Sequence, residues 1–136
     1  MRRILIGLVA LSMPCTGSAQ TMTANEFAAL APQKLGQVVT VASCFASNAS
    51  SAGVDCVYFG PQQAHDDLNW NVLIPVDGNT IDRQSLLRAL NNCADLNHRS
   101  DCHVSVTGTV HDAMADMGIN DNHVYALKSA TLKWLN

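Results

Sequence analysis

Cysteine is the residue type in this 136-residue sequence whose spacing constrains the chemistry most. Cys15 lies in an apolar N-terminal run, and four more cysteines follow it. Four cysteines allow three pairings, and we favour joining each to its nearest neighbour, because these pairs link adjacent predicted elements. The favoured pairs are Cys44–Cys56 and Cys93–Cys102. The sequence has no C-x-x-C redox motif and no cysteine pair two to four residues apart for zinc. We therefore expect two structural disulfides and an oxidising compartment.

The five histidines would bind a metal ion only if several of them converged. His103 and His111 share one face of a predicted strand but are eight residues apart, which corresponds to roughly 26 Å at about 3.3 Å per residue. His98 and His103 flank Cys102, which cannot bind a metal while it is oxidised. We therefore expect surface histidines, no metal site and no cofactor.

Acidic side chains are the remaining candidates for ion binding or catalysis. The segment 112–122 holds three aspartates and two asparagines, but it lacks the D-x-[DN]-x-[DN]-G spacing of calcium loops. Asp66 and Asp67 are adjacent, and sequence neighbours seldom converge on one reacting bond. The sequence also lacks G-x-S-x-G and glycine-rich phosphate loops. These observations favour a protein that is not an enzyme.

The charge balance disfavours a polyanionic partner. The chain has 8 basic and 11 acidic residues, a net charge of −3. Without Arg2 and Arg3, six basic residues face eleven acidic ones, and the net charge becomes −5. A nucleic acid would be repelled on average, so we predict that none binds. Beyond the N-terminus no apolar run approaches the ~18 residues of a membrane span, so we expect no stable membrane insertion.

Residues 1–19 have the pattern of a secretory signal peptide. Arg2-Arg3 is a basic start, Ile4–Leu11 is apolar, and Gly17-Ser18-Ala19 places small residues at a cleavage site. We therefore expect cleavage after Ala19 and a periplasmic or secreted protein.

Cleavage there would leave residues 20–136, which we interpret as a single domain. Two alternatives remain for the N-terminal run. An anchor helix is disfavoured because the run is short and Pro14 interrupts it. A lipoprotein would be acylated on Cys15, but Pro14 stands where such sites usually have a small residue.

Hydrophobic periodicity predicts two helices and five strands. One helix begins with the capping box Thr23–Glu26, and the other begins at Asp82, with Arg83, Arg88 and Asn92 facing away from its apolar stripe. Small polar residues predict a loop at Phe45–Gly53. The predicted strands are Val38–Cys44, Val54–Phe59, Trp70–Val76, His103–His111 and His123–Leu135.

Two local features refine the last two strands. Gly108 lies inside a strand of alternating valines, which indicates a bend or a bulge. In the final strand, Leu127 and Ala130 have opposite parity, so a bulge at Lys128-Ser129 would let both face the interior.

Three motifs resemble the first, fourth and fifth strands of small exported bacterial OB-fold proteins. They are Leu35–Val41, Val104–Val110 and Leu127–Leu132, in an order of helix, three strands, helix and two strands. Gln37 replaces the usual lysine, and Ser43-Cys44 departs from the usual Gly-x-Val. The resemblance implies an all-β fold with accessory helices. Its core would be a five-stranded OB-like Greek-key barrel, with one helix before it and one between strands three and four.

The resemblance also implies a non-enzymatic binding module whose ligand contacts strands two and three and the loops one–two and four–five. We expect Tyr58 and Trp70 to face the core, which leaves Phe45 as a stacking platform. We expect Met114 and Met117 to cover one end of the barrel. The candidate ligand-binding residues are Phe45, Asn48, Tyr58, Trp70, Met114, Asp116 and Met117.

These features together predict an exported binding or adaptor protein that recognises another protein or a small polar ligand in the periplasm. The alternative is a secreted glycan-binding subunit or a hydrolase inhibitor. The sequence leaves the oligomeric state open.

Overall fold

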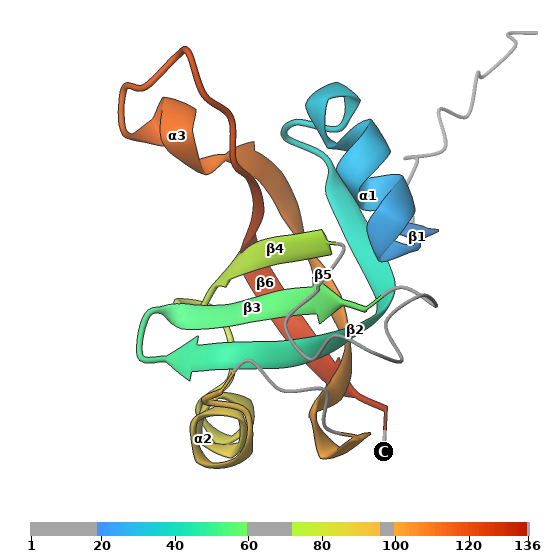
Figure 1. Ribbon diagram of the computed structural model, residues 1–136, viewed down its shortest axis with the longest axis vertical. Helices are drawn as coiled ribbons and strands as arrows, with labels where there is room; N and C mark the ends of the chain where they lie inside the picture. The colour runs from blue at the N-terminus through green and yellow to red at the C-terminus, as the bar shows by residue number, and fades with distance from the viewer. Residues whose placement is uncertain (1–18, 60–71, 96–99, 136) are drawn as a thin grey trace, which may run out of the picture.

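The computed structural model describes residues 19–59, 72–95 and 100–135 (Figure 1). Most of these residues form strands, and short helices lie between them. The strands are β1 Gln20–Met22, β2 Val38–Ser50, β3 Gly53–Tyr58, β4 Val72–Asp77, β5 His103–Asp112 and β6 Tyr125–Trp134. The helices are α1 Ala24–Leu30, α2 Arg83–Asn92 and α3 Ala113–Asp116, with 3-10 turns at Ala31–Gln33 and Ser100–Cys102. None of the described helices is long and apolar enough to cross a membrane.

Five strands close into a barrel, which confirms the prediction of a mostly β fold with a few helices. The order is β2-β3-β4-β6-β5, and β5 pairs back onto β2. The closing pair β4–β6 is parallel and meets at Val76 and Leu127, whereas the other barrel pairs are antiparallel. A sixth strand, β1, runs parallel to the start of β2. This short strand was not predicted from the sequence.

The prediction of a loop at Phe45–Gly53 is wrong, because β2 continues to Ser50. The register of β2 shifts between Val41 and Cys44, and again between Ser47 and Ser50. These irregularities let its first part pair with β5 and its last part pair with β3. Pairing on both parts supplies backbone hydrogen bonds to a segment of low β propensity, so tertiary context overrides the local sequence.

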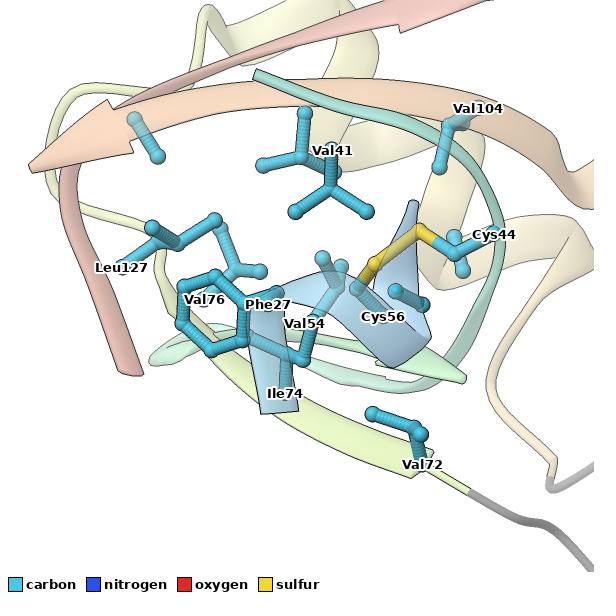
Figure 2. Close-up of a cluster of buried hydrophobic side chains, with 14 of the residues drawn as sticks. Phe27, Val41, Cys44, Val54, Cys56, Val72, Ile74, Val76, Val104 and Leu127 are labelled. Atoms are coloured by element: carbon cyan, nitrogen blue, oxygen red, sulfur yellow. A yellow bond between two sulfur atoms is a disulfide. The ribbon is translucent and has the colours of Figure 1, made fainter. Parts of the chain in front are cut away.

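The core lies inside the barrel and contains one of the two predicted disulfides (Figure 2). Cys44 and Cys56 join β2 to β3 among buried valines. Phe27 of α1 reaches into the same cluster and is 2% exposed. The predicted capping box is present, since the Thr23 hydroxyl accepts a hydrogen bond from the Glu26 amide and the Glu26 carboxylate accepts one from the Thr23 amide. This cap fixes the start of the helix that carries Phe27.

The predicted bulge in the last strand is present. The β5–β6 register shifts between Thr107 and Thr109, and Ser129 has a φ of 50°. A side chain at Gly108 would come within 3.0 Å of the Lys128 carbonyl, so glycine permits the close approach of the two strands. Leu127 and Ala130 are both buried as expected.

Helix α2 begins at the predicted cap, where Asp82 accepts a hydrogen bond from the Ser85 amide. The second predicted disulfide, Cys93–Cys102, ties its end to the start of β5. The expectation that Arg88 faces away is wrong: its guanidinium lies 4.0 Å from the centre of the Trp134 ring. A cation–π contact with a partly buried indole is stronger than one that is fully exposed to water, and this favours the inward orientation of Arg88.

Candidate functional site

A cleft of about 270 Å³ lies where the β2–β3 turn, the end of β4 and the β5–α3 junction meet. These are the regions in which the sequence placed a binding site. Apolar atoms form most of its lining surface, and a few polar side chains interrupt it. The lining residues are Asn48, Ser50, Ala52, Gly53, Val54, Asp55, Pro75, Val76, Asp77, His111, Ala113 and Ala126.

One wall of the cleft carries a half-buried carboxylate. Asp55 lies in the middle of β3, opposite Ser47 of β2 and Pro75 of β4. The Asn48 side chain donates a hydrogen bond to Asp55 Oδ2 over 3.1 Å. Burial raises the pKa of the Asp55 carboxyl, and the hydrogen bond from Asn48 partly opposes that rise. The carboxylate is therefore held where its charge is incompletely solvated.

Asn48 reaches this position because the backbone of β2 bends there. Its φ is 48°, in the left-handed region that asparagine tolerates better than most residues. Its amide donates to the Asp95 carbonyl, and the next amide, of Ala49, donates to the Cys93 carbonyl. The segment that follows α2 thus fixes the bend that brings Asn48 to the cleft.

The opposite wall carries an imidazole. His111, near the end of β5, places Nδ1 2.6 Å from Oδ2 of Asp116 in α3. His111 also lines a second groove, together with Leu35, Asp116 and Lys128. The His111 ring therefore separates the cleft from this groove.

Asp112 organises the segment that leads from β5 to β6. Its Oδ1 accepts hydrogen bonds from the amides of Met114, Ala115 and Val124. Its Oδ2 lies 2.6 Å from His123 Nδ1. The hydrogen bond from His123 is the largest cause that lowers the pKa of the Asp112 carboxyl, and the backbone amides add to it.

Four cysteines are in disulfides and cannot act as nucleophiles. Ser43 Oγ does contact His103 Nε2, but this exposed pair does not line the cleft. In the described ranges, no group of three or more histidine, cysteine or acidic side chains is placed to hold a metal ion.

The structure brings two of the seven candidate residues to the cleft region. Asn48 lines the cleft, and Asp116 adjoins it through His111. Met117 is 67% exposed, so the expectation that it covers the end of the barrel is wrong. It follows the short helix α3, which projects away from the barrel (Figure 1). Met114, in the same helix, is partly buried.

The aromatic candidates do not line the cleft. Phe45 stacks on His103, with ring centres 5.1 Å apart, and its ring centre lies 6.0 Å from that of Phe59. Tyr58 is half-buried against the core, in line with the expected inward orientation. Trp70 lies outside the described residues.

The sequence analysis missed Asp55, Asp77 and His111. A usable signal exists for Asp55, which is the only charged residue in the predicted strand Val54–Phe59. A charged residue between valine and cysteine in a barrel strand faces outward, on the side where OB folds bind ligands. No comparable sequence signal exists for His111, because it reaches the cleft only through the pairing of β5 with β6.

Comparison with known proteins does not assign the chain to a family. No family model matches it, and no curated protein or solved structure matches it either. The function is therefore inferred from the cleft and its surroundings.

Proposed function

We propose that this chain is an exported, non-enzymatic binding protein of the OB type that takes a small polar ligand into the cleft. The strand order β2-β3-β4-β6-β5, with α2 between β4 and β5, supports the OB assignment. In that assignment β3 and β4 are strands two and three. The β2–β3 turn and the segment between β5 and β6 are then the two ligand-binding loops.

The half-buried Asp55 carboxylate is the observation that carries the proposal. An ionised carboxylate has about four acceptor positions, and Asn48 supplies one donor. Burial raises its pKa, so the folded protein holds the charge at a cost that a donor group on a ligand would offset. A small ligand with an amine, amide or hydroxyl donor fits this requirement.

The size of the cleft also favours a small ligand. Its volume of about 270 Å³ is below the range of roughly 300–1,000 Å³ typical of drug-sized ligands. The lining residues include no phenylalanine, tyrosine or tryptophan ring on which a sugar could stack. Within the described part of the chain, the cleft therefore favours a small polar molecule over the glycan alternative.

Export is part of the proposal. Two disulfides suit an oxidising compartment, and residues 1–19 have the signal-peptide pattern. We propose that the binding protein begins near Gln20 and acts in the periplasm or outside the cell.

A binding screen with an Asp55→Asn variant tests the proposal. Small amines, amino acids and polyols are added to isotopically labelled protein, and amide signals are followed by NMR. We expect a hit to shift the signals of Asn48, Asp55 and Ala113, and Asp55→Asn to weaken it about tenfold or more, because hydrogen bonds to a charged group contribute about 1.5–3 kcal/mol.

The matched control is Asp121→Asn, which removes an exposed carboxylate away from the cleft lining. Its affinity should equal that of the unmodified protein. The proposal is overturned if no compound shifts the cleft signals, or if Asp55→Asn binds as tightly as the control.

A protein partner is the second candidate. Val38 and Met117 are 51% and 67% exposed, and Leu35 lines the groove next to His111. A contiguous apolar patch formed by these side chains would mark an interaction surface. A pull-down from periplasmic extract, with Met117→Lys as the comparison bait, would favour this candidate if the variant loses a specific partner.

A further inference from the structure

The segment between β5 and β6, residues 113–124, is tethered at both ends by a histidine–aspartate hydrogen bond. We call this segment the strap. Near its start, His111 of β5 contacts Asp116 of the strap over 2.6 Å. At its end, His123 of the strap contacts Asp112 of β5, also over 2.6 Å. Between the two tethers, residues 117–122 are all exposed.

The two tethers hold the strap from opposite sides of β5. His111 and Asp112 are consecutive in a strand, so their side chains point to opposite faces. His111 lies toward the cleft and the adjoining groove, whereas Asp112 is 8% exposed beneath the strap. Loss of one tether would therefore leave the strap held from one side only.

The charges that face the two rings are mostly negative. His111 has Asp116 beside it, Lys128 of β6 in the shared groove, and Asp55 of β3 and Asp77 of β4 around the cleft.

Among the described residues, a charged side chain and an aromatic ring contact His123. These are Asp112 of β5 and Tyr125, whose ring centre lies 5.9 Å from that of His123. The residues of α1 and β4 that line the hollow next to His123 are apolar. Carboxylates thus form the direct polar contact of both imidazoles.

We propose that the two histidine–aspartate pairs form a pH-dependent latch, which fixes the two ends of the strap to β5 firmly in mild acid and loosely above neutrality. Imidazoles change charge between about pH 5 and pH 8. A neutral ring donates an ordinary hydrogen bond, whereas a protonated ring makes a charge-assisted bond that is roughly twice as strong. Because His111 and Ala113 line the cleft, the latch would regulate access to it. This consequence rests on the proposed function, but the latch itself does not.

The acid limit of the latch depends on the carboxylates. The pKa of Asp112 is lowered by the His123 hydrogen bond and by backbone amides, so this carboxylate stays ionised below its usual range. A lowered carboxyl pKa contributes stability above the unfolded value of about 3.9, and that contribution is lost as pH falls through the folded value. The Asp112 carboxylate should therefore remain ionised from about pH 5 to pH 8, the range over which the latch is proposed to act.

Amide hydrogen exchange of the intact protein without ligand tests the latch directly. Protection of residues 113–124 is compared at pH 5.8 and pH 7.8 after correction for the intrinsic exchange rate. We expect on the order of tenfold greater protection at pH 5.8, with the central amides of β2 unchanged. Equal protection of the strap at the two pH values would overturn the proposal.

Variants separate the latch from general stability. His111→Gln with His123→Gln keeps a side-chain donor at each site but removes the charge change, so the pH dependence should disappear. If that protein does not fold, the exposed Asp116→Asn weakens one tether and should reduce the pH effect by itself. His103→Gln, on the distant Ser43 contact, is the matched control and should keep the full effect. Retained pH dependence in the double variant would contradict the latch.

Discussion

The cleft and the outward-facing side of β2 and β5, here called the outer face, differ in how their polar side chains are hydrogen-bonded. On the outer face, Thr40 and Thr107 hydrogen-bond to each other over 2.7 Å, and Ser43 contacts His103. In the cleft, burial dominates the environment of Asp55 and raises its pKa. On the outer face, polar side chains thus hydrogen-bond to each other between β2 and β5. In the cleft, the Asp55 carboxylate can still accept hydrogen bonds from a ligand. This difference supports the proposal that the cleft, rather than the outer face, takes the ligand.

The largest expected effect comes from adding a methyl group to the cleft wall. At Gly53 a Cβ would lie 2.0 Å from the Val76 carbonyl, and φ is 151°. Backbone must move to relieve that contact, so Gly53→Ala should lower the free energy of unfolding by about 3 kcal/mol and close part of the cleft. Gly36→Ala is the matched comparison, because φ is 79° but nothing lies within 4 Å of its Cβ. It should cost about 1 kcal/mol, from backbone strain alone.

Urea denaturation of both glycine variants measures the two values. Equal losses would show that the close approach of β3 and β4 near Gly53 does not constrain the cleft.

The two threonines of the outer face should behave as hydroxyl groups that are each other's hydrogen-bond partner. Thr40→Val leaves the partly buried Thr107 hydroxyl without its partner and should cost about 1 kcal/mol. Thr40→Val with Thr107→Val removes both groups, so the double variant should lose less than the sum of the two single variants. A double-mutant cycle by urea denaturation measures this coupling. Additive losses would mean that the two hydroxyls do not depend on each other.

The sequence predicted those parts of the fold that follow from local rules. The capping box at Thr23, the bulge opposite Gly108 and both disulfides each depend on residues close in the chain. The extension of β2 through Ser47 and Asn48 depends instead on pairing with β3 and on the distant segment after α2, where the Cys93 and Asp95 carbonyls accept the amides of Ala49 and Asn48. A run of small polar residues looks like a loop when only its own propensity is considered.

The site was predictable as a region but not as a set of residues. Asn48 was found because the sequence placed it in a loop between the first two predicted strands, although it lies within β2. His111 and Asp77 reach the same cleft from β5 and β4 only after the barrel closes. Arg88 was misplaced for a related reason, since its partner Trp134 is far away in the sequence. Long-range pairing, rather than composition, decides these positions.

A smaller effect should distinguish Asp55 from Asp112 by the sign of their pH dependence. Burial raises the pKa of Asp55, so its unfavourable contribution is present above the folded value and is relieved as pH falls through it. Asp112 behaves in the opposite way, because its lowered pKa contributes stability that is lost in acid.

Carboxyl carbon shifts followed by NMR from pH 7 to pH 2 test both directions. The Asp55 midpoint should lie above, and the Asp112 midpoint below, the ordinary aspartate value of about 3.9. Reversed midpoints would remove the electrostatic contrast between the cleft wall and the strap.

The smallest expected effect is that of a single-stranded oligonucleotide, for which we predict no binding at physiological salt. The outer face is where a polyanion would have to bind, because Phe45 and His103 stack there and the strand β6 carries Lys128 and Lys133. Stacking contributes about 1–3 kcal/mol per base, but one ring pair and two scattered lysines do not overcome the net negative charge and the cost of ordering the strand. Fluorescence anisotropy with a labelled oligonucleotide measures this. Micromolar binding that weakens steeply with salt and is lost in Phe45→Ala would make the outer face, rather than the cleft, the principal binding surface.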